Sequence, residues 1–105
     1  MKVLKFGGTS VGSVENIEKV ISIIKVASQE NKIAVVVSAF GGITDQLIQA
    51  GELAAAKDSN YVALFNSIKE RHLLAVSKLQ IEEKSPKLLE NILNRLEELL
   101  KGVFY

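Results

Sequence analysis

The segment KFGGTSV at residues 5–11 contains the residues of this chain whose types and order best suit chemistry. Two adjacent glycines let the backbone turn sharply and approach a ligand without a side chain in the way. Exposed amides in the turn, together with the N-terminus of a helix starting near Ser13, would form an anion site, and a lysine before the turn adds a mobile positive charge. The pattern predicts a polyphosphate site made of Lys5, Gly7, Gly8, Thr9 and Ser10.

The order of these residues differs from the two common nucleotide-binding motifs. In a P-loop the lysine follows the glycines, and in a dinucleotide fingerprint a third glycine stands at a set spacing. Residues 5–11 have neither pattern. A purely structural interpretation therefore stays open, in which the glycines only make a tight strand-to-helix turn and Lys5 is a solvated charge.

A second Gly-Gly segment, SAFGGITD at residues 38–45, follows the apolar run IAVVV at residues 33–37. The run predicts a central parallel strand buried on both faces. Because a right-handed crossover places the ends of parallel strands at one edge, both turns are expected where open α/β sheets bind ligands. Ser38 and Thr44 could orient a small polar substrate there, although Thr44 could equally be a helix N-cap. Asp45 could contact a cation or favour the helix N-terminus.

Taken together, the two segments resemble the N-terminal motifs of the aspartate kinases in the amino-acid-kinase superfamily. The first segment has the aspartate-kinase form of its motif, whereas a bare Lys-x-Gly-Gly is shared with glutamate, acetylglutamate and nucleoside-monophosphate kinases. The long helical stretch that follows resembles the bifunctional aspartokinase–homoserine dehydrogenases more than the short monofunctional kinases. The likeness covers residues 1–105, by motif at first and by pattern in the helical part.

The resemblance implies a fold and a reaction. The fold would be α/β, the N-terminal part of an amino-acid-kinase (carbamate-kinase-like) three-layer domain with parallel strands, crossover helices and a long helical segment. In the reaction, a side-chain carboxylate of L-aspartate attacks the γ-phosphate of ATP with Mg²⁺ and gives aspartyl phosphate, the first step toward lysine, threonine and methionine. Lys5 would stabilise the transferring phosphoryl group, the amides of Gly7 and Gly8 would bind phosphates, and Ser38 and Thr44 would hold aspartate.

Such a transfer depends mainly on positioning and charge neutralisation. A carboxylate nucleophile needs no general base, and the sequence has a single histidine and no cysteine to suggest another mechanism. No residue is assigned as a metal ligand. His72 has no neighbouring Cys or His to complete a metal site and is expected to be structural.

Several motifs of the family are missing from this sequence, which predicts that the chain belongs to a longer domain. The family's acidic Gly-Glu element, its later arginine and aspartate motifs and its adenine pocket have no counterpart in residues 1–105, and two buried-type strands are too few for a stable sheet. We therefore expect part of a catalytic domain that is inactive by itself, with strand–turn–helix units at residues 1–57 and a helical segment at residues 58–105.

Composition sets further bounds on the class of protein. The 105 residues are 48% hydrophobic, enough for one core, and a formal net charge of +1 gives no push toward nucleic acid or an anionic membrane. The lack of cysteine excludes a disulfide scaffold. No segment resembles a signal peptide or a bilayer-spanning run, so a cytoplasmic enzyme is the default expectation.

Apolar periodicity predicts four helices. Two follow the Gly-Gly turns, over residues 14–28 and 44–56, and the first should pack on the sheet as the crossover. The third runs from about residue 58 to Leu79 with the stripe Tyr61, Phe65, Ile68, His72, Val76 and Leu79. Residues 82–84 look like a solvated linker, and Ser85 should cap the last helix, with Pro86 in its first turn. Its apolar face comprises Leu89, Ile92, Leu93, Leu96, Leu99, Leu100 and Val103.

The helical half also supports an interpretation from another class, a non-catalytic module for self-association. Packing inside one domain is the simpler explanation of an amphipathic face. If the strands that would cover these faces are absent, the faces must be covered elsewhere, so the isolated chain should self-associate. A homo-oligomer is the expected state of the parent protein, and another amino-acid kinase acting on a carboxylate is the alternative enzyme.

Overall fold

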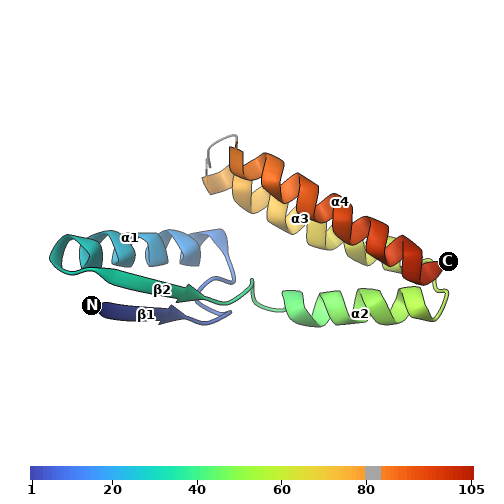
Figure 1. Cartoon of the computed structure of the whole chain (residues 1–105), viewed down its shortest axis with the longest axis horizontal. Coiled ribbons are helices and arrows are strands. Elements are labelled where there is room, and N and C mark those ends of the chain that lie inside the picture. The colour runs from blue at the N-terminus through green and yellow to red at the C-terminus, as the bar shows by residue number, and fades with distance from the viewer. Residues whose placement is uncertain (80–83) are drawn as a thin grey trace. The chain divides into compact units, whose positions relative to one another are not determined.

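The structure is a computed structural model that describes residues 1–79 and 84–105, with the side chains of Lys84 and Ser85 excepted. The elements in order are β1 (Lys2–Phe6), α1 (Val14–Glu30), β2 (Ile33–Val37), α2 (Ile43–Ala55), α3 (Tyr61–Leu79) and α4 (Lys84–Phe104) (Figure 1). This composition of parallel strands and helices confirms the predicted α/β class.

The chain forms two compact units, residues 1–44 and residues 45–105. Helix α2 begins at the end of the first unit and belongs mostly to the second. The sequence predicted a different division, with α2 in the same segment as the strands, residues 1–57. The difference arises because α2 shares its buried side chains with the later helices.

In the first unit, β1 and β2 pair in parallel with the register Lys2↔Ile33 to Phe6↔Val37, and α1 is the crossover between them (Figure 1). Ser13 starts α1, because its backbone is extended and its hydroxyl accepts a hydrogen bond from the Asn16 amide at 3.2 Å. Glu15 in the first turn adds a favourable charge at the positive end of the helix dipole.

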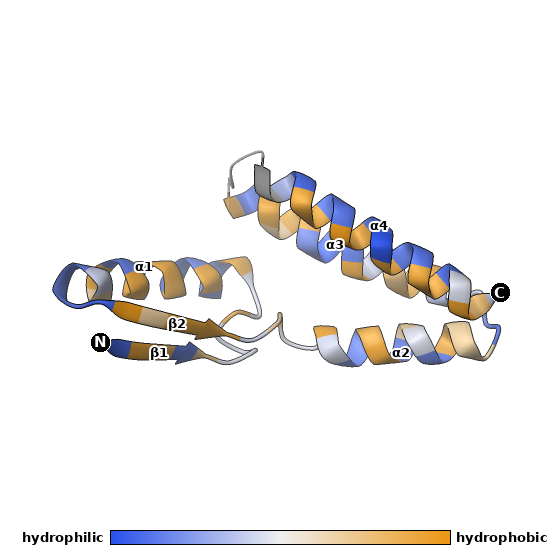
Figure 2. Cartoon of the chain, viewed as in Figure 1, coloured by the Kyte–Doolittle hydropathy of each residue, from blue (hydrophilic) through white to orange (hydrophobic). Residues whose placement is uncertain are grey.

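The expectation that β2 is buried on both faces is wrong for this chain. Val35, Val36 and Val37 are 39%, 49% and 58% exposed, and successive strand residues point to opposite faces, so neither face is fully covered at this end of β2. Figure 2 shows the strand as a largely hydrophobic ribbon. Two strands and one helix supply too few layers to enclose a strand of this composition.

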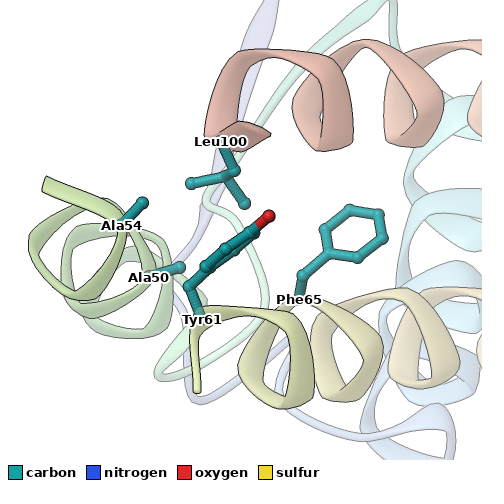
Figure 3. Close-up of a cluster of buried hydrophobic side chains, with 5 residues drawn as sticks. All are labelled: Ala50, Ala54, Tyr61, Phe65 and Leu100. Atoms are coloured by element: carbon teal, nitrogen blue, oxygen red, sulfur yellow. The ribbon is translucent and has the colours of Figure 1, made fainter. Parts of the chain in front are cut away.

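The second unit has its core where α2, α3 and α4 meet. Ala50 and Ala54 of α2 are fully buried against larger side chains from α3 and α4, namely Tyr61, Phe65 and Leu100 (Figure 3). Their small size permits a close approach between the helices. The rings of Tyr61 and Phe104 lie 5.2 Å apart, an arrangement that adds to the burial of apolar area.

Helix α3 has the predicted stripe, and it is described as far as Leu79. Tyr61, Phe65 and Ile68 are buried, and His72 is half-buried with its Nδ1 atom 2.8 Å from the carbonyl oxygen of Ile68. This contact agrees with the structural role expected for His72. Among the described residues, no cluster of His, Cys, Asp and Glu could hold a metal ion.

Helix α4 is described from Lys84 to Phe104. Glu82, Glu83 and the Ser85 side chain, on which the linker and cap predictions depend, lie outside the described residues. The predicted apolar face is only partly correct. A narrow seam is covered, Leu89, Leu93, Leu96 and Leu100, whereas Ile92, Leu99 and Val103 are exposed. The reason is that helices beside α4 cover one stripe and leave its flank open.

None of the described helices is long and apolar enough to cross a membrane.

Candidate functional site

The strand register brings the two Gly-Gly turns to one edge of the sheet. Phe6 pairs with Val37 at the last position of each strand, so both turns leave the sheet together. The backbone amide of Ser38 donates a hydrogen bond to the carbonyl oxygen of Phe6 at 3.1 Å and extends the pairing by one residue. The predicted juxtaposition of the turns at the carboxyl edge is therefore confirmed.

In the first turn, the carbonyl oxygens of Gly7 and Thr9 accept hydrogen bonds, while the amides are left available. The Val11 amide donates to Gly7 O at 3.3 Å, and Thr9 O accepts from both the Gly12 amide at 3.2 Å and the Asn16 side chain at 3.1 Å. Within the described part of the chain, the amides of residues 7–10 donate no hydrogen bond. Four consecutive amides ahead of a helix N-terminus are suited to anionic oxygens.

The second turn leads directly into α2. The Ile43 amide donates to Phe40 O at 3.1 Å, and Gly42 takes a positive φ of 82°, which glycine adopts without strain. Because α2 starts at Ile43, Thr44 lies inside the first helical turn, and its interpretation as the N-cap is wrong. Asp45 is in the same turn, where its charge favours the helix N-terminus.

The two turns touch through bare backbone. A Cβ atom built on Gly8 would lie 3.5 Å from Gly41 Cα, and one built on Gly41 would lie only 3.1 Å from Gly8 O. The sequence predicted Gly41 only as a turn residue and indicated no role for Gly12. The doubled glycine was a signal for a tight turn, but no local pattern could indicate which backbone it would meet.

Lys5 and the hydroxyl residues after it lie on different sides of the first strand. Side chains alternate along β1, so Lys5 is on the face opposite Phe6, which packs toward α1. A hollow of about 250 Å³ on the α1 side is lined by Phe6, Thr9, Ser10, Asn16, Lys19, Val20 and Ile23. The Lys5 side chain is exposed and makes no ion pair or hydrogen bond to any described residue.

The hydroxyl groups at this edge are also unpartnered. The side chains of Thr9, Ser10, Ser38 and Thr44 form no hydrogen bond with the residues that the structure describes. Ser38 is joined to the first turn through Phe6, while no hydrogen bond in the described residues connects Thr44 to it. Amides, hydroxyls and an ammonium group near one sheet edge are the donors that an oxygen-rich anion requires.

Comparison with known proteins identifies the family of this chain. The model of the amino acid kinase family matches residues 1–101. The chain is 36% identical over 104 residues to aspartokinase 1, chloroplastic, of Arabidopsis thaliana, covering 96% of this chain and 18% of that protein. It is 39% identical over 104 residues to the aspartokinase of Candida albicans, covering 92% of this chain and 19% of that protein.

A bifunctional aspartokinase/homoserine dehydrogenase 1, chloroplastic, of Arabidopsis thaliana is 33% identical over 105 residues, with 97% of this chain and 11% of that protein covered. The chain thus spans about a fifth or less of the length of these relatives. The family model, by contrast, matches almost all of its residues. With its two turns at the sheet edge and this match along its length, the chain belongs to the amino acid kinase family.

Proposed function

We propose that a protein containing these residues is an aspartate kinase, which transfers the γ-phosphoryl group of ATP to the side-chain carboxylate of L-aspartate. The observation that carries the proposal is the meeting of two Gly-Gly turns at the carboxyl edge of parallel strands, with four unused amides in the first. The names of the relatives supply the acceptor, because they are called aspartokinases. The product, an acyl phosphate, would enter lysine, threonine and methionine biosynthesis.

The first turn binds the phosphates in this proposal. Amides of Gly7, Gly8, Thr9 and Ser10 donate to phosphate oxygens, and the dipole of α1 favours the negative charge. Lys5 extends its unpaired ammonium group to the γ-phosphoryl oxygens, where negative charge must be neutralised during transfer. Mg²⁺ enters with ATP as the substrate complex.

The second turn holds the acceptor. The hydroxyls of Ser38 and Thr44 bind polar groups of aspartate and direct its side-chain carboxylate toward the γ-phosphorus. A carboxylate oxygen forms the new P–O bond, the bond from the γ-phosphorus to the bridging oxygen breaks, and ADP leaves with that electron pair. No proton is removed from the nucleophile, so the site needs no general base.

We further propose that the 105-residue chain is inactive and self-associates. The valines at the end of β2 and a flank of α4 are exposed apolar surfaces that burial would stabilise: Val35, Val36, Val37, Leu88, Ile92, Leu99 and Val103. The longer protein would be a homo-oligomer that acts in the cytoplasm.

The decisive experiment measures ADP release with ATP, Mg²⁺ and aspartate. It compares the polypeptide translated from the longest open reading frame that contains this sequence with the 105-residue chain. Aspartate-dependent release by the longer polypeptide alone is the expected result. Release with glutamate but not with aspartate would favour another carboxylate kinase of the family.

A second candidate function, a non-catalytic association module, is favoured by one observation, the exposed apolar flank of α4. Sedimentation and thermal unfolding distinguish it from the kinase. Concentration-dependent association of the longer polypeptide, with no effect of ATP on its melting temperature and no ADP release, would support the module. Stabilisation by ATP with Mg²⁺ would support the kinase.

A further inference from the structure

Two glycines, Gly12 and Gly41, lie close to the carbonyl group of a third, Gly8, at the candidate site. A Cβ on Gly41 would lie 3.1 Å from Gly8 O, 3.6 Å from Gly8 C and 3.9 Å from Gly12 Cα. A Cβ on Gly12 would lie 3.1 Å from the same oxygen and 3.2 Å from Thr9 O. All the close atoms are backbone atoms, which cannot rotate away as a flexible side chain can. We call this contact of Gly8, Gly12 and Gly41 the glycine seam.

The glycines of the two turns are required for different reasons. Gly42 needs its positive φ, and a Cβ there would meet nothing within 4 Å. A Cβ on Gly8 would have ordinary contacts of 3.5 Å or more, and one on Gly7 would meet nothing within 4 Å. Between the turns, it is therefore at Gly41 that a Cβ atom would be closer than an ordinary van der Waals contact.

We propose that Gly41 is a positioning residue for phosphoryl transfer, an inference that rests on the proposed function. Its bare backbone lets the acceptor-holding turn pack directly on the phosphate-binding turn. The glycine seam then sets the separation between the amides of residues 7–10 and the hydroxyls of Ser38 and Thr44. In-line transfer is sensitive to that separation, because a misplacement of about 1 Å can cost roughly a hundredfold in rate.

The test is Gly41→Ala in the longer polypeptide that shows activity. The added methyl must push the seam apart by a few tenths of an ångström. Each turn keeps its own ligand groups, so both KM values should stay within about threefold while kcat falls about tenfold. Gly51→Ala is the matched control, because a Cβ at this helical glycine meets nothing within 4 Å, and its kinetics should match the wild type.

A second readout separates positioning from loss of folded protein. Aspartyl phosphate is trapped with hydroxylamine, and the hydroxamate formed per ADP released is measured. A displaced carboxylate admits water as a competing acceptor, which gives ADP and inorganic phosphate, so the ratio should fall below that of the wild type in Gly41→Ala. Misfolding would lower both products equally and leave the ratio unchanged. An unchanged ratio in Gly41→Ala whose circular dichroism spectrum matches that of the wild type overturns the proposal.

Two measurements keep the proposal testable if Gly41→Ala folds poorly. Gly12→Ala brings a methyl to the same 3.1 Å from Gly8 O and should lower the product ratio in the same direction. In the 105-residue chain, Gly41→Ala should shift the amide NMR signals of Gly8 and Thr9, whereas Gly51→Ala should not. Unshifted Gly8 and Thr9 signals would overturn the glycine seam itself.

Failure of the proposed kinase function would give a different result from failure of the positioning role of Gly41. If the wild-type longer polypeptide releases no ADP with aspartate, the kinase proposal fails and the positioning role falls with it. If the wild type is active and Gly41→Ala retains its kcat and product ratio, only the positioning role is overturned.

Discussion

Phe65→Ala is the substitution whose effect follows most directly from the packing. Phe65 is 3% exposed and lies in the core shared by α2, α3 and α4 (Figure 3). Truncating a buried phenylalanine costs about 3–5 kcal/mol through lost transfer free energy and the cavity left behind. A unit of roughly sixty residues has a free energy of unfolding of about 3–9 kcal/mol, from about 0.05–0.15 kcal/mol per residue. The variant should therefore lose most of the stability of the helical unit.

The assay is urea unfolding of the dilute 105-residue chain, followed by far-UV circular dichroism. Val62→Ala is the control, because Val62 lies on the same helix, is exposed, and should cost no more than about 0.5 kcal/mol. A comparable slope against urea in both variants would show that the difference lies in stability. If Phe65→Ala unfolds at the same midpoint as Val62→Ala, the three helices do not share the core described above.

Three further predictions concern the first unit and the reaction. Lys5→Ala in the active longer polypeptide should lower turnover by roughly 10²–10³, since it removes an electrostatic stabiliser of the transition state. Lys2→Ala is the control and should leave steady-state turnover near wild type. Near-normal turnover in Lys5→Ala would remove Lys5 from the mechanism. Ser13→Ala should destabilise the start of α1 by about 1 kcal/mol, seen as faster amide hydrogen exchange in its first turn; unchanged exchange would contradict the cap. Gly42→Ala should cost about 1–2 kcal/mol because of its positive φ, and Gly42→Asn less, in chemical unfolding of the first unit; equal costs would argue against backbone strain.

Local elements of the fold were predictable because local forces form them. The apolar stripe of α3 predicted a helix through about Leu79, and the expected start of α1 at Val14 agrees with the cap that Ser13 provides. The parallel pairing of β1 with β2 followed from one crossover helix between two short strands. These predictions need only periodicity, capping chemistry and connection length.

Burial was less predictable than element type. The composition of β2 is that of an enclosed strand, yet its valines are exposed. Only four of the seven residues in the predicted apolar face of α4 are covered. An apolar pattern states which side chains gain from burial but not whether another element is present to cover them. The alternative interpretation of Thr44 as a cap failed for a different reason, because helix α2 already starts at Ile43, directly after the positive φ of Gly42.

The sequence by itself determined the chemistry available to this protein. The two Gly-Gly segments, with a lysine before the first and hydroxyl residues in both, indicated local turns and the donors those turns can offer, and their resemblance to aspartate-kinase motifs indicated the family. Only the tertiary structure decided that Gly41 meets the carbonyl of Gly8 and that Lys5 lies on the sheet face opposite α1. Those facts depend on strand register and backbone packing between segments distant along the chain, which no local pattern of residues encodes.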